Sequence, residues 1–306
     1  MLIKSMNLTT KLGNLSLKTP IICASGTFGY GEEIKELVDF KNIGAITTKT
    51  ITLQPREGNP APRIYETDYG VINSIGLENP GLDGFLEEKL PKLTELPVKF
   101  IVSVGGFSQE DYEEIVGRLE TKNEIEALEV NLSCPNIKMK KMFSQNKELT
   151  YNLVKSLRSL TKKTLIIKLT PEVSDIVEIA KAAEDAGADA LSAVNTFFAI
   201  AIDTETKKPY LGSIYGGYSG RAIKPLALYK TWQVAKNVKV PVIGGGGIEN
   251  TNDTLEFILA GATAVSLGTV NLVYPNKATD IVKGIKDYLT QTKIDDINKL
   301  KGALIV

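Results

Sequence analysis

The sequence predicts an α/β fold, a single (β/α)8 barrel (TIM barrel) formed by residues 1–306 as one domain. Short, nearly continuous apolar runs recur along the chain, which is typical of parallel strands covered on both faces. Amphipathic segments with helical spacing separate these runs, so predicted strands and helices alternate. The length of 306 residues is sufficient for eight such βα units.

The predicted barrel strands are the eight apolar runs at residues 21–25, 45–49, 100–104, 128–132, 165–169, 190–194, 242–246 and 264–268. Between them, residues 174–188 carry apolar side chains at i, i+3, i+4 spacing, with Ser174 as the expected N-cap and Gly187 as the expected stop. Residues 250–262 repeat this design and end at Gly261. These segments predict helices that pack on the outside of the barrel.

The N-terminal segment predicts a β-hairpin that closes the bottom of the barrel. Residues 2–8 and 13–18 alternate apolar and polar side chains around a Gly13-Asn14 turn. Long connections follow the second, fourth and sixth strands, at residues 50–79, 133–147 and 196–225. Because barrels build their active sites from the loops at the C-terminal strand ends, we expect the site there.

The composition excludes several kinds of chemistry. The chain has no histidine, which removes Ser-His-Asp and Cys-His mechanisms and His-ligated metals. Its two cysteines cannot hold an iron–sulfur cluster or a structural zinc within this chain. We therefore expect no metal site here, and any redox metal would have to belong to another chain.

Charge and hydropathy argue against nucleic-acid and membrane partners. The 36 basic and 36 acidic residues give a net charge of zero, so there is no bulk attraction to either surface. No stretch reaches the roughly 18 uninterrupted apolar residues of a membrane span. The first residues also lack the apolar centre of a signal peptide. We therefore expect a cytoplasmic protein.

Polar residues end most of the predicted strands, and these ends meet at one mouth of a barrel. They are Ser25, Lys49, Ser103, Asn131, Lys168 and Asn195. A single lysine in such a place is more often a solvated charge. Two lysines and two asparagines together predict a site for an anionic, amide-rich ligand.

Glycines after the last two strands predict a phosphate site. Gly246–Gly247 and Gly268–Thr269 stand at these strand ends, where small residues let backbone N–H groups approach a phosphate closely. Gly220, in the sixth loop, could add a further backbone donor. A glycine run can also serve only as a flexible turn, but phosphate sites recur after strands seven and eight of this fold.

The second long loop and the two cysteines supply further candidates. Asn73 and the small residues up to Leu77 form either a plain turn-rich connection or a surface that offers amide and N–H groups to a planar polar ligand. Cys23 lies within an apolar run and is expected to be a buried small hydrophobe. Cys134 follows a strand end and precedes Pro135, so the chain cannot easily continue into a helix. A thiol with a pKa of about 8.5 is a feasible general base, and without histidine Cys134 is the best-placed candidate.

Together, the motifs NLSCPN, NSIGLENPG, REGNPAPRI, GGGGI and LGT resemble those of the class 1 dihydroorotate dehydrogenases, FMN enzymes of pyrimidine synthesis. The resemblance covers essentially the whole chain, and the motifs agree in order and spacing. GTFGYG, NLSCPNIK and residues 201–228 resemble subclass 1B more than the fumarate-using subclass 1A. This resemblance implies a homodimer, or a heterotetramer with two partner subunits that carry FAD and a [2Fe–2S] cluster and pass electrons to NAD⁺.

The resemblance also implies roles for individual residues. Cys134 would be the catalytic base, and Lys168 would stabilise the negative charge that develops on reduced FMN. FMN would be bound by Ser25, Lys49, Thr50, Asn131, Lys168, Val194, Gly220, Gly246, Gly247, Gly268 and Thr269. Dihydroorotate or orotate would be bound by Lys49, Asn73, Ser74, Ile75, Gly76, Leu77, Asn131, Asn136, Asn195 and Thr196. The loop from Ser133 to Lys147 would close over the substrate.

Two departures from the 1B pattern stand out. The loop after Cys134 reads KMKKMF where 1B relatives usually carry a Gly-Gly pair, and Ser103 stands where the third strand often ends in asparagine. Four alternatives stay open: a fumarate-dependent 1A-type enzyme, an FMN oxidoreductase like that of dihydropyrimidine dehydrogenases, a non-redox phosphate-binding barrel, and a ligand-binding module. Lys49 and the backbone donors of the second loop favour a substrate with a carboxylate, such as orotate.

Overall fold

Eight parallel strands close into a barrel in the computed structural model, which describes residues 6–133, 135–136 and 141–305. The strands pair in chain order, and the last strand pairs in parallel with the first. All eight apolar runs of the sequence are confirmed as barrel strands. Their bounds are β3 (Ile21–Cys23), β4 (Ala45–Thr47), β7 (Lys99–Val104), β8 (Ala127–Asn131), β11 (Thr164–Leu169), β12 (Ala190–Ala193), β17 (Val242–Gly245) and β18 (Ala264–Leu267).

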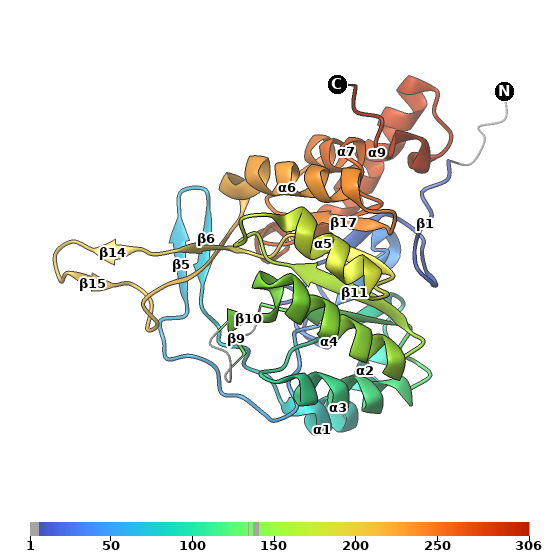
Figure 1. The fold of residues 1–306 in the computed structure, drawn as a ribbon. Helices are drawn as coiled ribbons and strands as arrows, with labels where there is room; N and C mark the ends of the chain where they lie inside the picture. The colour runs from blue at the N-terminus through green and yellow to red at the C-terminus, as the bar shows by residue number, and fades with distance from the viewer. Residues whose placement is uncertain (1–5, 134, 137–140, 306) are drawn as a thin grey trace.

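Helices pack around the outside of the barrel (Figure 1). They are α1 (Gly81–Gly84), α2 (Leu90–Thr94), α3 (Gln109–Glu120), α4 (Lys147–Leu160), α5 (Ile176–Asp185), α6 (Lys224–Asn237), α7 (Thr251–Leu259), α8 (Val270–Val273) and α9 (Lys277–Thr292). A π-helical segment at Phe85–Lys89 joins α1 to α2, and short 3₁₀ turns lie at Glu32–Ile34, Phe40–Asn42, Phe143–Gln145, Arg221–Ile223 and Ile297–Leu300. Within the described ranges, no helix is both long and apolar enough to cross a membrane.

Local side chains decide where the predicted helices begin and end. The N-cap of α5 is Asp175 and not Ser174, so that prediction is wrong by one residue. The Asp175 carboxylate accepts hydrogen bonds from two backbone N–H groups of the first turn, at 2.8 and 3.3 Å, and its charge also suits the helix N-terminus. The predicted stops of α5 and α7 are confirmed at Gly187 and Gly261, whose φ values of 101° and 113° favour glycine.

The interior of the barrel is filled in layers. The lower layer alternates isoleucine and alanine from strand to strand, so that large side chains face small ones. These buried residues are Ile22, Ala45, Ile101, Ala127, Ile166, Ala190, Ile243 and Ala264. Two residues further along each strand, side chains point to the same face. The residues at those positions are Ala24, Thr47, Ser103, Glu129, Lys168, Ser192, Gly245 and Ser266, so the interior becomes mostly polar toward the mouth.

A hairpin closes the bottom of the barrel, as the sequence predicts. Its strands β1 (Thr10–Leu12) and β2 (Leu15–Leu17) pair antiparallel around a two-residue Gly13-Asn14 turn. Leu12, Leu15 and Leu17 are fully buried and pack against the lower layer of the barrel. Figure 1 shows β1 at one end of the molecule and the long loops at the other.

The first arm of this hairpin differs from the sequence prediction, which placed it at residues 2–8. Asn7 instead forms a parallel bridge with Asp296, and its N–H donates to the Asp295 carbonyl at 2.8 Å. Residues 2–5 lie outside the described ranges. The arm begins at Thr10 because Thr10–Leu12 directly face the second arm across the short turn.

The second and sixth long loops pair with each other in one antiparallel sheet, in the order β13-β16-β6-β5. Its strands are β5 (Ile64–Thr67), β6 (Gly70–Asn73), β13 (Phe197–Ala199) and β16 (Gly216–Ser219). A further hairpin, β14 (Ile202–Asp203) and β15 (Lys208–Pro209), extends away from the barrel (Figure 1). In the fourth loop, β9 (Pro135–Asn136) pairs with β10 (Lys141–Met142). The sequence predicts only loops here, since these strands are two to four residues long and β16 pairs with the distant β6.

Replacing Leu15 by alanine removes a side chain that closes the bottom of the barrel. Because Leu15 is fully buried, the free energy of unfolding should fall by about 2–5 kcal/mol, measured by denaturant titration. The matched change Ser16→Ala, at an exposed position of the same strand, should stay within about 0.5 kcal/mol of the unchanged protein. Equal effects of the two changes would mean that the hairpin does not pack into the barrel.

Candidate active site

A cavity of about 490 Å³ lies at the C-terminal ends of the barrel strands. It takes residues from the ends of the strands and from the second and sixth loops. All eleven residues to which the family resemblance gives an FMN-binding role line it: Ser25, Lys49, Thr50, Asn131, Lys168, Val194, Gly220, Gly246, Gly247, Gly268 and Thr269. The barrel therefore brings these residues, which are far apart in the sequence, to one place.

The glycines of the last two strand ends form a cradle of bare backbone. Gly246 and Gly247 have φ values of 128° and 73°. A Cβ added to Gly247 would lie 2.8 Å from the carbonyl oxygen of Gly220 and 2.8 Å from the backbone nitrogen of Lys224. A Cβ added to Gly268 would meet no described heavy atom within 4 Å, so its backbone borders open space. This arrangement fits a phosphate group, which backbone N–H groups bind at close range.

Two amide side chains are linked beside the cavity. Asn195 Nδ2 donates to Asn131 Oδ1 at 3.3 Å and to Ser133 Oγ at 3.0 Å. Asn131 Oδ1 also accepts from the N–H of Ser133 at 3.3 Å, and its backbone carbonyl accepts from the Tyr112 hydroxyl at 2.7 Å. These bonds fix the two amides on the cavity wall. Each amide combines donors with an acceptor, which suits a ring edge of alternating N–H and C=O groups.

The second loop presents every other residue to the cavity. Asn73, Ile75 and Leu77 line it, as does Thr196 of the sixth loop, whereas Ser74 and Gly76 do not. The backbone leaves the extended conformation after Asn73, the last residue of β6, and Gly76 and Leu77 have φ values of 77° and 57°. The hydroxyl of Ser74 faces the other way and accepts from Asn59 Nδ2 at 2.8 Å, and the Gly76 carbonyl accepts from Arg56 Nε at 3.3 Å. Any contact of Ser74 or Gly76 with a ligand would have to use the backbone.

A chain of hydroxyl groups runs from the cavity wall into the barrel. Ser25 Oγ donates to the Thr48 carbonyl at 2.7 Å and lies 3.3 Å from Thr50 Oγ1. Thr50 Oγ1 lies in turn 2.9 Å from Ser103 Oγ. Ser103 is fully buried and does not line the cavity. Ser103 therefore supports the Thr50 side chain from inside the barrel.

The cavity also contains residues that sequence reasoning missed. They are Ala24, Gly26, Thr27, Gly29, Ile64, Val71, Ser192, Ser219, Ile223, Gly245, Ser266 and Leu272. Some were accessible to the same logic, because Ala24, Ser192, Gly245 and Ser266 occupy the upper inward positions of their strands. Others, such as Ile64 and Val71, lie in the sheet that only the structure reveals.

The structure describes one of the two cysteines, Cys23. Cys23 is fully buried in β3, and burial raises the pKa of its thiol far above the ordinary value, so its predicted packing role is confirmed. Cys134 lies outside the described residues. For Asn136 the structure describes only the backbone, in β9. The lid predicted at residues 133–147 contains the undescribed residues 137–140, so its predicted closure stays a prediction.

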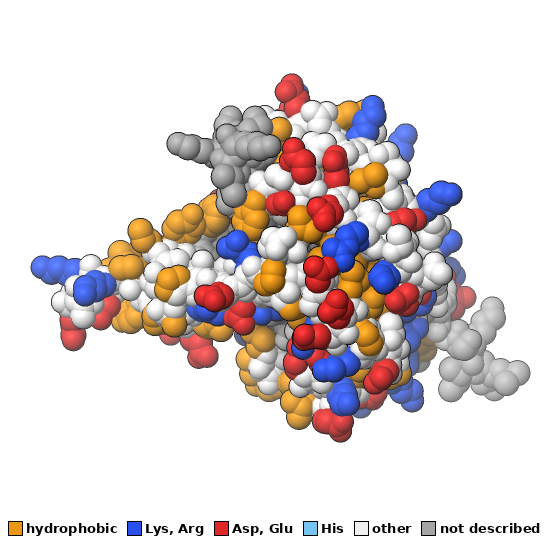
Figure 2. Space-filling view, turned by 90° about the horizontal axis from the view of Figure 1, so that it is seen from below, with side chains coloured by type: hydrophobic (Ala, Val, Ile, Leu, Met, Phe, Trp, Pro, Cys, Tyr) orange, Lys and Arg blue, Asp and Glu red, His pale blue; other side chains and the backbone are white. Residues whose placement is uncertain are grey.

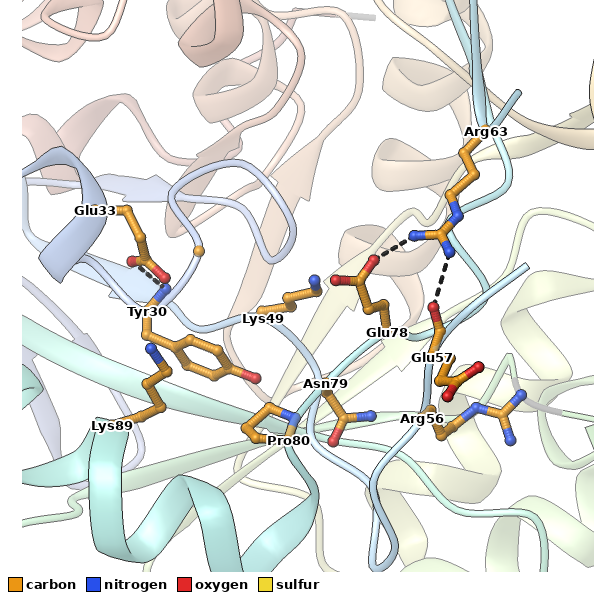
Figure 3. A pocket seen from close by; sticks show the side chains of 11 residues that line it. Tyr30, Glu33, Lys49, Arg56, Glu57, Arg63, Glu78, Asn79, Pro80 and Lys89 are labelled. Atoms are coloured by element: carbon orange, nitrogen blue, oxygen red, sulfur yellow. Dashed lines mark hydrogen bonds and ion pairs between the residues drawn. The ribbon is translucent and has the colours of Figure 1, made fainter. Parts of the chain in front are cut away.

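A second pocket of about 630 Å³ adjoins the cavity and shares Gly29 and Lys49 with it. Figure 3 shows Lys49 among the charged side chains of this pocket, with Arg63 paired to Glu78 and Glu33 bonded to the backbone N–H of Tyr30. Arg63 contacts the Glu78 carboxylate and donates to the Glu57 carbonyl at 2.8 Å. Lys49 is different, because its ammonium makes no hydrogen bond or ion pair with any other described residue. Its positive charge is therefore available to an anionic ligand.

Several known proteins are similar to this chain. The family model described as dihydroorotate dehydrogenase matches residues 7–291. A Trichlorobacter lovleyi protein named dihydroorotate dehydrogenase B (NAD(+)), catalytic subunit, is 49% identical and covers 97% of this chain and 98% of its own. A protein of the same name from Desulforamulus reducens is 48% identical, with the same two coverages of 97% and 98%. The solved structure of DHODH from Eimeria tenella in complex with ferulenol has a TM-score of 0.79 at 24% identity, covers 99% of this chain and 90% of that chain, and shares the fold.

Replacing Gly247 by alanine should weaken the binding of FMN. The added Cβ would approach two backbone atoms at 2.8 Å and hold an unfavourable positive φ, so we expect at least about tenfold weaker binding. Fluorescence titration of the flavin-free protein with FMN measures this. Gly117→Ala, in α3 where an added Cβ meets no described atom within 4 Å, is the control and should leave FMN affinity unchanged. Equal affinities of the two variants would remove Gly247 from the phosphate cradle.

Proposed function

The chain belongs to the dihydroorotate dehydrogenase family, and on this basis we propose that its cavity binds FMN and oxidises dihydroorotate to orotate in pyrimidine biosynthesis. The reaction removes a proton from C5 and a hydride from C6, which creates the C5=C6 double bond. When bound, FMN supplies the acceptor for that hydride. The main support for this proposal is that all eleven residues assigned to FMN line one cavity.

The proposal assigns the two ends of FMN to different parts of the cavity. The backbone at Gly246, Gly247, Gly268 and Thr269 would bind the phosphate, with Gly220 beside it. Lys168 would lie near the N1/C2 carbonyl edge of the flavin, where its ammonium would stabilise the negative charge that reduction adds. The remaining contacts would come from Ser25, Lys49, Thr50, Asn131 and Val194.

The substrate is proposed to lie against the second loop and the linked amides. Lys49 would pair with the orotate carboxylate, which is supported by the lack of an ion pair between its ammonium and any other described residue. The set proposed to bind the substrate is Lys49, Asn73, Ser74, Ile75, Gly76, Leu77, Asn131, Asn136, Asn195 and Thr196. Within it, Ser74 and Gly76 would act only through their backbone.

Cys134 is proposed to be the base that removes the C5 proton as a thiolate. The preceding residue supports this, because Ser133 Oγ accepts from the cavity amide of Asn195 at 3.0 Å and so ties the chain to the cavity just before Cys134. The chain offers no histidine for this step, and the Cys23 thiol is buried in β3. Loss of the proton at C5 and transfer of the hydride from C6 together need both groups at the same ring edge.

The proposed final electron acceptor is NAD⁺, reached through a partner subunit that carries FAD and a [2Fe–2S] cluster. The names of the relatives support both parts, since they specify NAD(+) and a catalytic subunit. The two cysteines of this chain are also too few for a cluster of its own. The same names speak against a fumarate-dependent enzyme and against a dihydropyrimidine dehydrogenase-like enzyme.

We propose that the chain forms a homodimer, or a heterotetramer with two partner subunits, in the cytoplasm. Exposed apolar side chains support association, because soluble monomers rarely expose large apolar patches. On the arm formed by β13 to β16 these are Phe198, Ile200, Ile202, Tyr210, Ile214 and Tyr215. Figure 2 shows hydrophobic side chains gathered along this arm and charged ones at its tip.

Replacing Cys134 by alanine should lower turnover by about 10² or more at neutral pH, as expected for the loss of a general base, while orotate still binds. Cys134→Ser should recover activity only at higher pH, because a hydroxyl is a weaker acid than a thiol. Steady-state rates with dihydroorotate across pH and orotate titrations measure both effects.

The matched control is Cys23→Ala. Burial raises the pKa of this thiol and keeps it from the cavity, so its removal should leave the pH profile unchanged. Unchanged turnover of Cys134→Ala would exclude Cys134 as the base.

The acceptor proposal predicts how the isolated chain behaves with different oxidants. With dihydroorotate as the donor, the purified chain should reduce an artificial dye but neither NAD⁺ nor fumarate. Addition of the partner subunit should then restore NAD⁺ reduction. Fumarate reduction by the chain alone would indicate the 1A type, and direct NAD⁺ reduction would remove the need for a partner.

A further inference from the structure

Glu129 places a negative charge inside the barrel, directly below the cavity. It occupies the upper inward position of β8, two residues before Asn131, and its side chain is only 7% exposed. Its Oε1 lies 3.6 Å from the ammonium of Lys168, whose side chain is 14% exposed. Lys168 lines the cavity and Glu129 does not. The pair therefore has its positive end at the cavity and its negative end one layer deeper.

The surroundings of Glu129 do not satisfy its carboxylate fully. Among the described residues, the buried Oε1 has no hydrogen-bond partner. Its register partner on β7, Ser103, has its hydroxyl next to Thr50 Oγ1 at 2.9 Å. A buried carboxylate without full hydrogen bonding costs stability, and an apolar or amide side chain would fill this place at lower cost. Its presence directly under the cavity calls for an explanation beyond packing.

We infer that Glu129 lowers the reduction potential of the flavin by offsetting the positive charge of Lys168. This inference rests on the proposed function, because it requires FMN in the cavity. Hydride transfer gives the flavin one further negative charge, which Lys168 attracts and Glu129 repels. A lone Lys168 would hold the electrons on the flavin, whereas the pair leaves the reduced flavin better able to pass them on. That suits a weakly oxidising acceptor such as NAD⁺.

The test is the midpoint potential of bound FMN in variants that replace a charged side chain by the neutral amide of glutamine. In Glu129→Gln, reduced flavin should be favoured about tenfold over the unchanged protein, a rise of about 30 mV for a two-electron couple. Lys168→Gln should lower the potential. Glu126→Gln is the matched control, because this exposed carboxylate is paired with Lys99 at the start of the barrel strands and should leave the potential unchanged. An unchanged or lower potential in Glu129→Gln overturns the inference.

A second comparison covers the case in which Glu129→Gln alone does not fold or hold FMN. The double variant Lys168→Gln, Glu129→Gln removes both charges and leaves neither unpaired. Its potential should lie above that of Lys168→Gln alone, and an equal or lower value overturns the inference. The proposed function fails separately, since an unchanged protein that binds no FMN would end it, whereas FMN with an unresponsive potential ends only the role of Glu129.

Discussion

Closing eight parallel strands into a barrel forces alternate side chains of every strand inward, and the rest of the molecule depends on this constraint. In this chain, the inward side chains form two layers of different polarity. The lower layer is apolar and alternates isoleucine with alanine, so that it packs without polar groups. The upper layer carries hydroxyls, Glu129 and Lys168, whose polar groups need partners or a ligand. Because the interior is apolar at one end of the barrel and mostly polar at the other, the polar end is the one that can bind a polar or charged ligand.

The two ends are completed by segments outside the barrel. Three leucines of the N-terminal hairpin seal the apolar end. At the other end, the second and sixth loops pair into an antiparallel sheet beside the mouth, and both contribute residues to the cavity. Backbone pairing between the loops holds Asn73 next to the sixth loop, where its Nδ2 donates to the Gly217 carbonyl at 3.1 Å. The cavity is therefore built on paired backbone as well as on strand ends.

The sequence predicts most of this because its signals are local. Continuous apolar runs identify all eight barrel strands, and strand ends in a barrel must converge, so the polar strand ends could be placed at one site without coordinates. The complete set of residues assigned to FMN came from the resemblance to a known family. The sequence does not decide whether Ser174 or Asp175 is the N-cap of α5, because both side chains can cap a helix. The sheet of loops two and six was missed because Gly216–Ser219 has no β-type alternation and finds its partner far along the chain. Asn73, Ile75 and Leu77 line the cavity while Ser74 and Gly76 do not, and this depends on the irregular backbone after β6, where Gly76 and Leu77 have φ values of 77° and 57°, so it could not be predicted either.

The central claim is that the cavity at the polar end of the barrel binds FMN with the pyrimidine beside it. The absorbance spectrum of the purified protein, recorded during titration with orotate, tests it most directly. The account predicts one flavin per chain and a saturable change of the flavin spectrum as orotate binds next to the ring. A colourless protein that takes up no FMN, or a flavin spectrum that does not respond to orotate, would contradict it.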